Sequence, residues 1–420
     1  MRKNYSIRSS NPYIKQYIQN NTVTHKYDLK KTGFVLVIVA LIVIILSIVV
    51  NFALAADGSE ELSENIKNLL DKLDLSDLQK YLDENGSDYL KKFGGTAREI
   101  IEYLLRGNAN TDYSGYLSQL FSIIFKDVLN LIPAFATVTG VALLSAVVSA
   151  AEGGIIGKSI AKIVHLACYS LIILIVASML TGVVADCIQC IGNIKRQIEI
   201  FTPILATLTV LTGGTSSAAI YQPSAIFLSG GAVEIINGFI FPATVAVVVL
   251  DSMSRINPQM SFSGVSALIK SIMKWVIGIT ITVFSIFITA QSSASSLFDG
   301  IIFKATKFVV GNSVPMVGNF LSSGFDMLTS AGLLIKSSVG FCGIIVLLFE
   351  IIQPVIVLIS FSFILKIVGA IVQPIGEKGL YDLLSDLSKD VDYFIAGLLT
   401  VAFMYTLVIM LIVNSANSFI

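Results

Sequence analysis

The chain is 420 residues long, and its composition excludes a water-soluble globular protein. Hydrophobic residues make up 55% of the sequence, charged residues only 13%, and the mean hydropathy is +0.82. Soluble domains carry about a quarter charged residues, so this chain has too little charge to cover its apolar surface in water. Basic and acidic residues balance at 28 each. Because seven of the basic residues and one acidic residue lie in residues 1–55, the rest has no basic stripe, which argues against nucleic acid as a partner.

The N-terminus carries the pattern of an export signal. Gly33 to Val50 is an uncharged run of 18 residues that follows Lys30 and Lys31. A positive flank, an apolar run and a small-x-small site are typical of a secretory signal peptide. The expected cleavage follows residue 55, at the small residues Ala53, Ala55 and Ala56. The run is also long enough to span a bilayer, so a permanent signal anchor over residues 1–55 is the alternative.

Residues 56–112 predict a small extracytoplasmic helical segment. Residues 57–112 hold thirteen acidic and seven basic residues, and their leucines and isoleucines recur at helical spacing. Thr96 and Glu99 form a capping-box pattern at the start of one helix, and Gly107 follows its end. The segment is too short to bury a large core, so we expect it to pack on the membrane domain or on a partner.

Residues 113–420 predict a multi-span membrane domain. Apolar runs of about 20 residues, the length that crosses a bilayer, give about seven spans. They are expected at Leu129–Ala150, Ile163–Val184, Ile198–Ala219, Ala225–Leu250, Leu268–Ala290, Val339–Leu365 and Val391–Val413. No stretch alternates at period two over the length of a membrane strand, which argues against a β-barrel. The predicted fold class is therefore all-α: a polytopic helical membrane protein with an N-terminal signal or anchor.

The charges beside these spans predict an orientation for the first two. With residues 57–128 outside, the loop that holds Lys158 and Lys162 is cytoplasmic, as the positive-inside rule requires. Continued alternation then places Lys195 and Arg196 outside, against the same rule. A re-entrant segment at one of the glycine-rich breaks would remove this conflict.

The third and fourth predicted spans are joined by a segment that breaks regular backbone. Glycines free the chain, hydroxyl groups can hydrogen-bond it, and a proline removes one donor. The candidate residues are Gly213, Gly214, Ser217, Gln222 and Pro223. Irregular backbone at membrane depth survives only when it is buried in protein or lines a wet cavity. The segment is therefore either a pore lining or a plain interhelical turn with small residues for close packing.

Two further features lie within or beside the apolar runs. Glu350 is in the middle of the sixth predicted span, where a carboxylate faces the bundle or a cavity. It is a candidate for a proton or ion relay, for a structural pair, or for a glutamic acid that is held protonated. Cys187 and Cys190 match the C-x-x-C spacing of a redox pair or half a zinc site, but no second pair of ligands follows at comparable spacing. An exported pair could form a disulfide.

The sequence offers no catalytic motif. It contains no Gly-x-Ser-x-Gly, Walker A or His-Glu-x-x-His pattern. We therefore expect a protein that is not an enzyme, with no catalytic residue, no metal and no cofactor.

Residues 292–338 predict an amphipathic region of short helices separated by glycine, asparagine and proline. The stretch is too polar to span a membrane and too apolar to stay free in water. Its charged and helix-breaking residues are candidates for packing or partner contacts: Asp299, Gly300, Lys307, Gly311, Asn312, Pro315 and Gly318.

This series closely resembles the stage III sporulation protein AE family of endospore-forming Firmicutes. The resemblance covers roughly residues 120–415, and the signal-like N-terminus and charged exported segment fit it in character. The other stretches that carry it contain Gly213, Gly214, Ser217, Pro223, Gln373 and Pro374. Cys187, Cys190 and Glu350 are not features of the resemblance, which gives them no role.

The resemblance implies a non-enzymatic subunit of a channel or secretion-like complex that links mother cell and forespore. Members are expected in the mother-cell membrane around the forespore, where the channel sustains late forespore development and gene expression. The implied partners are the other proteins of the stage III operon, including an ATPase and ring-forming subunits, and a forespore-side protein. A YidC/Oxa1-type insertase is implied for assembly.

A secondary transporter or permease is the alternative function. Its midplane site would lie at the broken helices around residues 213–223, with Glu350 as a coupling carboxylate. Substrate-dependent flux by the purified protein would favour the transporter, because a subunit alone should show none.

Overall fold

The computed structural model describes residues 66–85, 95–105, 113–151, 157–256, 262–313, 318–375 and 378–415. Within these residues the fold is all-α, without strands, which confirms the predicted class. A helix satisfies its backbone N–H and C=O groups within its own segment, and in lipid this makes it the structure that long apolar runs adopt. The predicted signal or anchor, with Ala53, Ala55 and Ala56, lies outside the described residues.

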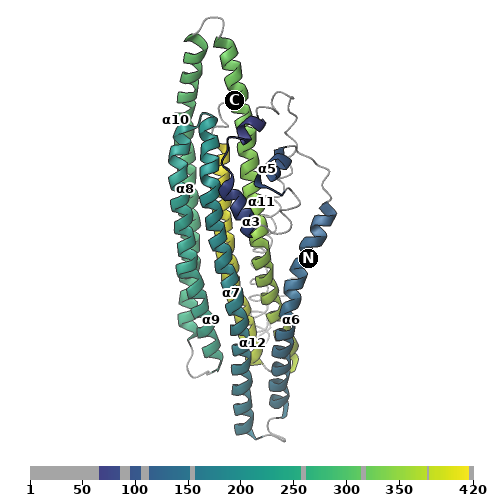
Figure 1. Cartoon of the computed structure of the whole chain (residues 1–420). Helices are drawn as coiled ribbons and strands as arrows, with labels where there is room; N and C mark the ends of the chain where they lie inside the picture. Colours follow the sequence, from purple (N-terminus) through teal and green to yellow (C-terminus); the bar gives the residue numbers. More distant parts are fainter. Residues whose placement is uncertain are drawn as a thin grey trace, which may run out of the picture. The chain divides into compact units, whose positions relative to one another are not determined.

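Two short helices come first among the described elements, and much longer helices follow (Figure 1). The short ones are α3 (Ser76–Asn85) and α5 (Ala97–Leu105). The long ones begin with α6 (Tyr113–Ala151) and α7 (Lys158–Leu211). They continue with α8 (Thr215–Ile235), a π-helical turn η1 (Ile236–Ile240), α9 (Phe241–Ile256), α10 (Ser263–Ser313), α11 (Gly318–Val372), a 3₁₀ turn η2 (Gln373–Ile375) and α12 (Lys378–Asn414).

In the described part of the chain, six helical stretches are long and apolar enough to cross a membrane. They are Leu129–Ala151, Ser159–Leu211, Thr215–Ile256, Ser263–Gln291, Thr329–Val372 and Gly379–Asn414. The number differs from the predicted seven because Ile163–Val184 and most of Ile198–Ala219 belong to the single helix α7. The polar residues between these two runs do not end the helix. Arg196 and Gln197 contact α3, and Asn193 contacts α11.

The helix α7 is much longer than a bilayer is thick. Its 54 residues extend over about 80 Å, whereas the hydrocarbon core measures about 30 Å. Arg196, well inside this helix, forms an ion pair of 2.7 Å with Glu84 of α3. Arg196 and the predicted exported segment therefore lie on the same side of the predicted membrane. Simple alternation of the spans, without a re-entrant segment, also predicts that side for Arg196.

The region predicted as short amphipathic helices is built differently. Residues 292–313 continue α10, and residues from 318 onward belong to α11. Gly311 and Asn312 lie in the last turns of α10 and do not end it earlier. Once a helix is established, each further residue adds a backbone hydrogen bond, so a long helix can continue through single residues of low propensity. The prediction of several short helices is wrong for this stretch.

The core lies around α12, which packs against α7, α8, α9, α10 and α11. Of the candidate spans it has the largest buried share. Phe394 of α12 contacts Phe241 with ring centroids 5.1 Å apart, and Phe361 of α11 meets Phe135 of α6 at 5.3 Å. Tyr405 is fully buried and donates a hydrogen bond to the carbonyl of Gly343. Large aromatic side chains thus join α12 and α11 to the helices that surround them.

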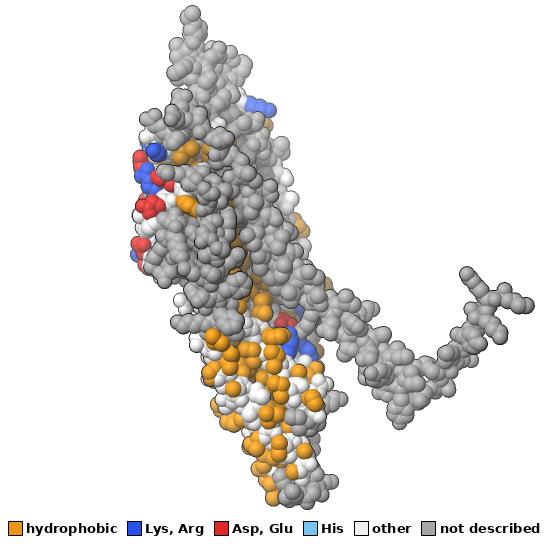
Figure 2. All heavy atoms as spheres, turned by 90° about the vertical axis from the view of Figure 1, so that its right-hand side faces the viewer, with side chains coloured by type: hydrophobic (Ala, Val, Ile, Leu, Met, Phe, Trp, Pro, Cys, Tyr) orange, Lys and Arg blue, Asp and Glu red, His pale blue; other side chains and the backbone are white. Residues whose placement is uncertain are grey.

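Exposed apolar side chains lie on α6 and α7, which pack against each other, and also on α10. In Figure 2 hydrophobic side chains cover the lower part of the view, where α6 and α7 lie in Figure 1. The exposed residues of these two helices include Leu144, Val147, Ile163, Leu166 and Leu174. A surface of this kind suits lipid, because lipid tails are as apolar as leucine.

Candidate functional site

The turn between α7 and α8 brings together Gly213, Gly214, Ser217 and Asp299 from the predicted set. Gly213 has a φ of 88°, a left-handed conformation that glycine adopts without steric cost. The N–H of Gly213 donates to the Val210 carbonyl at 3.0 Å, and that of Gly214 donates farther back in α7 at 2.8 Å. The break is thus a tight turn whose backbone donors are satisfied locally.

Asp299, which α10 supplies, caps the start of α8. The side chain is fully buried, and its carboxylate accepts hydrogen bonds from the backbone N–H groups of Ser216 at 2.9 Å and Ser217 at 3.1 Å. The first N–H groups of a helix have no partner within it, and Gly214, at the N-cap position, has no side chain to offer. A carboxylate there also interacts favourably with the positive end of the helix dipole.

A buried lysine joins this turn to α11 and to the end of α12. Lys336 is fully buried, and its Nζ donates to the backbone carbonyl of Ser415 and, at 3.3 Å, to its hydroxyl. The hydroxyl of Ser415 in turn lies 3.5 Å from Thr209 Oγ1, near the end of α7. One turn before Lys336, Gly332 makes room for Thr212, because a Cβ at Gly332 would lie 2.8 Å from Thr212 Cγ2. The turn is therefore held by charge, hydrogen bonds and close packing.

The other predicted motif residues lie apart from this turn. Gln222 and Pro223 are exposed on α8, and Gln373 and Pro374 are exposed in η2. Along α11, Gln373 is about 60 Å from Gly332, so the second Gln-Pro pair does not contribute to the turn. Of the remaining set, Pro315 lies outside the described residues, and the helices α10 and α11 hold Gly300, Lys307, Gly311, Asn312 and Gly318.

Glu350 lies at a second candidate site, where α3 meets α7 and α11. Asn193 Nδ2 donates to Glu350 Oε1 at 2.7 Å, and the Tyr81 hydroxyl is a further hydrogen-bond partner of this carboxylate. Gln197 Nε2 donates to the same hydroxyl at 2.8 Å. Burial, together with the negative charge of Glu350, raises the pKa of Tyr81 above its ordinary value. The carboxylate is thus part of a hydrogen-bonded network, and the relay stays a prediction.

The same network fixes the predicted exported segment. Arg196 of α7 pairs with Glu84 and lies over the ring of Tyr81, 5.8 Å from its centroid. The predicted capping box of α5 is present, because the N–H of Thr96 donates to Glu99 Oε2 at 3.1 Å and the N–H of Glu99 donates to Thr96 Oγ1 at 3.2 Å. Since α5 also packs on α11, both short helices rest on the long ones.

The cysteines Cys187 and Cys190 are buried on α7 as free thiols. Cys190 Sγ contacts the backbone carbonyl of Glu350 at 3.5 Å, so it lies beside the second candidate site. Among the residues that the structure describes, no group of three or more His, Cys, Asp or Glu side chains is placed to hold a metal ion.

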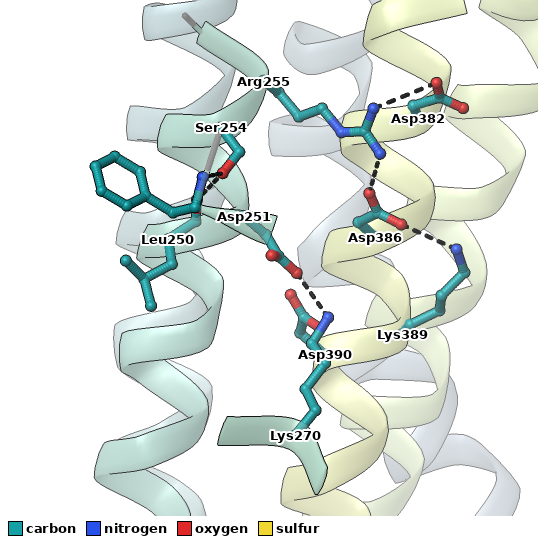
Figure 3. Close-up of polar contacts among 10 residues, drawn as sticks. Leu250, Asp251, Ser254, Arg255, Lys270, Asp382, Asp386, Lys389 and Asp390 are labelled. Atoms are coloured by element: carbon teal, nitrogen blue, oxygen red, sulfur yellow. Dashed lines mark hydrogen bonds and ion pairs between the residues drawn. The ribbon is translucent and has the colours of Figure 1, made fainter. Parts of the chain in front are cut away.

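Sequence reasoning missed a charged cluster among α9, α10 and α12 (Figure 3). Lys270 Nζ lies 2.6 Å from Asp251 Oδ2 and 2.6 Å from Asp390 Oδ1. These residues stand at or near the ends of predicted apolar runs, where charges are ordinary. The overlooked signal is in α12, where aspartates recur every fourth residue, at Asp382, Asp386 and Asp390, and therefore share one helix face.

Comparison with known proteins identifies relatives over most of the chain. The family described as stage III sporulation protein AE matches residues 96–416. The stage III sporulation protein AE of Bacillus subtilis (strain 168) is 24% identical over 394 residues, which cover 93% of this chain and 98% of the relative. No solved structure gives a significant match. The family match runs from the start of α5 through α12, so this chain belongs to the stage III sporulation protein AE family.

Proposed function

We propose that this protein is a non-enzymatic membrane subunit of the channel or secretion-like complex that connects mother cell and forespore. The observation that carries the proposal is the match to a stage III sporulation family over residues 96–416, in a chain whose described part holds six membrane-length helices. Its role would be to sustain late forespore development and gene expression. Its place would be the mother-cell membrane around the forespore.

The contacts of the buried polar groups support a subunit whose helices form a scaffold. Asp299 caps another helix, Lys336 binds the end of α12, and Glu350 takes part in the contact between α3 and α7. Each group thus joins helices to one another, which suits a structural role. The proposed partners are the other stage III operon proteins, including an ATPase and ring-forming subunits, a forespore-side protein, and a YidC/Oxa1-type insertase for assembly.

The test is deletion of the gene in its spore-forming host, with a late forespore-specific reporter followed during engulfment. We expect engulfment to finish while the late reporter stays dark and the forespores shrink. Complementation with the wild-type gene controls for effects on neighbouring genes. Normal spore formation by the deletion strain would contradict the proposal.

Reconstitution separates the subunit from the alternative transporter. The purified protein in liposomes should move no small solute by itself, because a subunit needs its complex. Substrate-dependent flux that is lost on replacing Glu350 would instead favour a transporter with a midplane site.

A further inference from the structure

Among the described residues, the ion pairs of the charged cluster at α9, α10 and α12 join four carboxylates to three cations (Figure 3). Arg255 pairs with Asp382 at 3.4 Å and with Asp386 at 2.5 Å, and Lys389 pairs with Asp386 at 2.9 Å. These two cations therefore balance the two outer aspartates. Lys270 is left with both Asp251 and Asp390, each at 2.6 Å from its Nζ.

The inner carboxylates have little access to water. The side chain of Asp390 is 0% exposed and that of Asp251 is 11% exposed. All three residues of the inner group lie in helices of membrane length. An unbalanced negative charge in such a place is costly, because burial keeps water away and, in the part of the chain that the structure describes, no second cation forms an ion pair with either carboxylate.

The buried carboxylate of Asp390 is incompletely satisfied. Lys270 Nζ forms an ion pair with Oδ1, but within the described residues neither Oδ1 nor Oδ2 accepts a hydrogen bond of regular geometry. The carboxylates of Asp251 and Asp390 each lie 2.6 Å from the same Lys270 Nζ, so the two bound oxygens are at most about 5 Å apart. Two carboxylates at this separation cannot both ionise readily and commonly share one proton.

We propose that Asp251 and Asp390 share one exchangeable proton and form, with Lys270, a proton-binding site at the junction of α9, α10 and α12. The proton binds to one carboxylate oxygen and is donated to the other residue's carboxylate, so the group of three becomes electrically neutral. A metal cation would bind to these carboxylates less well than a proton, because the ammonium of Lys270 would repel it.

Within the described residues, the charged and titratable groups around the pair come from three helices. Asp251 and Arg255 come from α9, Lys270 from α10, and α12 adds Tyr393 and the paired Asp386. On the side of α12 that faces α11, the neighbouring polar contact is the uncharged pair of Ser362 and Ser388 hydroxyls, 2.9 Å apart.

The site would couple protonation to the packing of α10. This helix has the smallest buried share of the candidate spans, 17%, and in its first turns Lys270 forms ion pairs with both α9 and α12. Loss of the shared proton would leave two carboxylates facing each other and weaken that attachment. This consequence follows from the geometry alone and does not depend on the proposed function.

Infrared spectroscopy of the full-length protein in lipid nanodiscs tests the site. We expect the wild type to show, at neutral pH, the C=O band of a protonated carboxyl that shifts in heavy water and disappears at alkaline pH. Asp390→Asn and Asp251→Asn should each lose this band, because a single remaining carboxylate pairs with Lys270. The control is Asp77→Asn on the exposed face of α3, which should keep it.

Each result decides the proposal. No such band in the wild type at neutral pH, or a band of unchanged intensity in either cluster variant, would overturn it. An asparagine amide is the closest replacement for a protonated carboxyl, so both variants should also fold. Failure of both to accumulate, while Asp77→Asn accumulates normally, would equally overturn a protonated pair.

Discussion

A carboxylate such as Glu350, placed inside an apolar helix, lowers stability unless donors surround it. Here Asn193 and Tyr81 provide those donors. The sequence placed Glu350 inside a span and left open whether it is a relay or a structural partner. It could not identify the donors, because Tyr81 is more than a hundred residues earlier in the predicted exported segment.

Replacing Glu350 separates the two interpretations. Glu350→Gln keeps an oxygen that can accept from Asn193, so we expect near wild-type unfolding in detergent and normal sporulation. Glu350→Ala leaves buried donors unpaired and should cost about 1–3 kcal/mol. A relay cannot run on an amide, so a folded Glu350→Gln protein that fails to support sporulation would contradict the structural interpretation.

The ionisation of Tyr81 reports on the same contact. Burial and the charge of Glu350 raise its pKa above the ordinary value of about 10. The folded state therefore favours the neutral phenol of Tyr81. The resulting contribution to the free energy of unfolding is fully present below a pH of about 10, and it is lost as the pH rises through the folded-state pKa. We expect the tyrosinate absorbance difference between wild type and Tyr81→Phe to appear only above the range of ordinary tyrosines.

Glu350→Gln provides the matched control for that titration. Removing the negative charge takes away one of the two causes of the shift, so Tyr81 should ionise at a lower pH in this variant. If Tyr81 of the wild type ionises at the pH at which ordinary tyrosines do, α3 does not cover this site.

At the scale of elements, apolar length predicted where helices lie but not where they end. Ile163–Val184 and Ile198–Ala219 read as two spans because Lys195 and Arg196 separate them. In the structure those charges face outward from one continuous helix, and Arg196 binds Glu84. Hydropathy alone does not distinguish a loop from a polar stretch of helix that another segment covers.

The turn between α7 and α8 was predicted from its glycines, and the structure shows which backbone conformation requires glycine at position 213. Gly213 has a φ of 88°, so Gly213→Ala should destabilise the protein by about 1–2 kcal/mol. Gly230→Ala is the matched control, because Gly230 lies inside α8 with open space around its Cα. There alanine should stabilise by about 0.5–1 kcal/mol. Equal thermal midpoints for the two variants would contradict the assigned conformation.

At the scale of the whole molecule, the charges of distant segments fit one another. The predicted exported segment is acidic, and it rests beside Arg196, the residue that violated the positive-inside rule. Arg196 lies within the continuous helix α7 and not in a short loop between spans, and it pairs with Glu84 of the predicted exported segment. Long-range pairs of this kind leave no local pattern in the sequence, and the contact between Asp299 and the start of α8 is another example. The sequence therefore predicted the class of the fold better than its contacts.

This arrangement predicts on which side of the membrane three exposed lysines lie. Lys80 is on α3, Lys162 is at the start of α7, and Lys195 is beyond the first apolar run of α7. Each can be replaced by cysteine, because the four native cysteines are buried and should react slowly. We expect a membrane-impermeant maleimide to label Lys80→Cys and Lys195→Cys on intact protoplasts, and Lys162→Cys only after permeabilisation. If Lys195→Cys instead behaves like Lys162→Cys, α7 does not cross the membrane between these positions, and the contact of α3 with Arg196 would have to form on the cytoplasmic side.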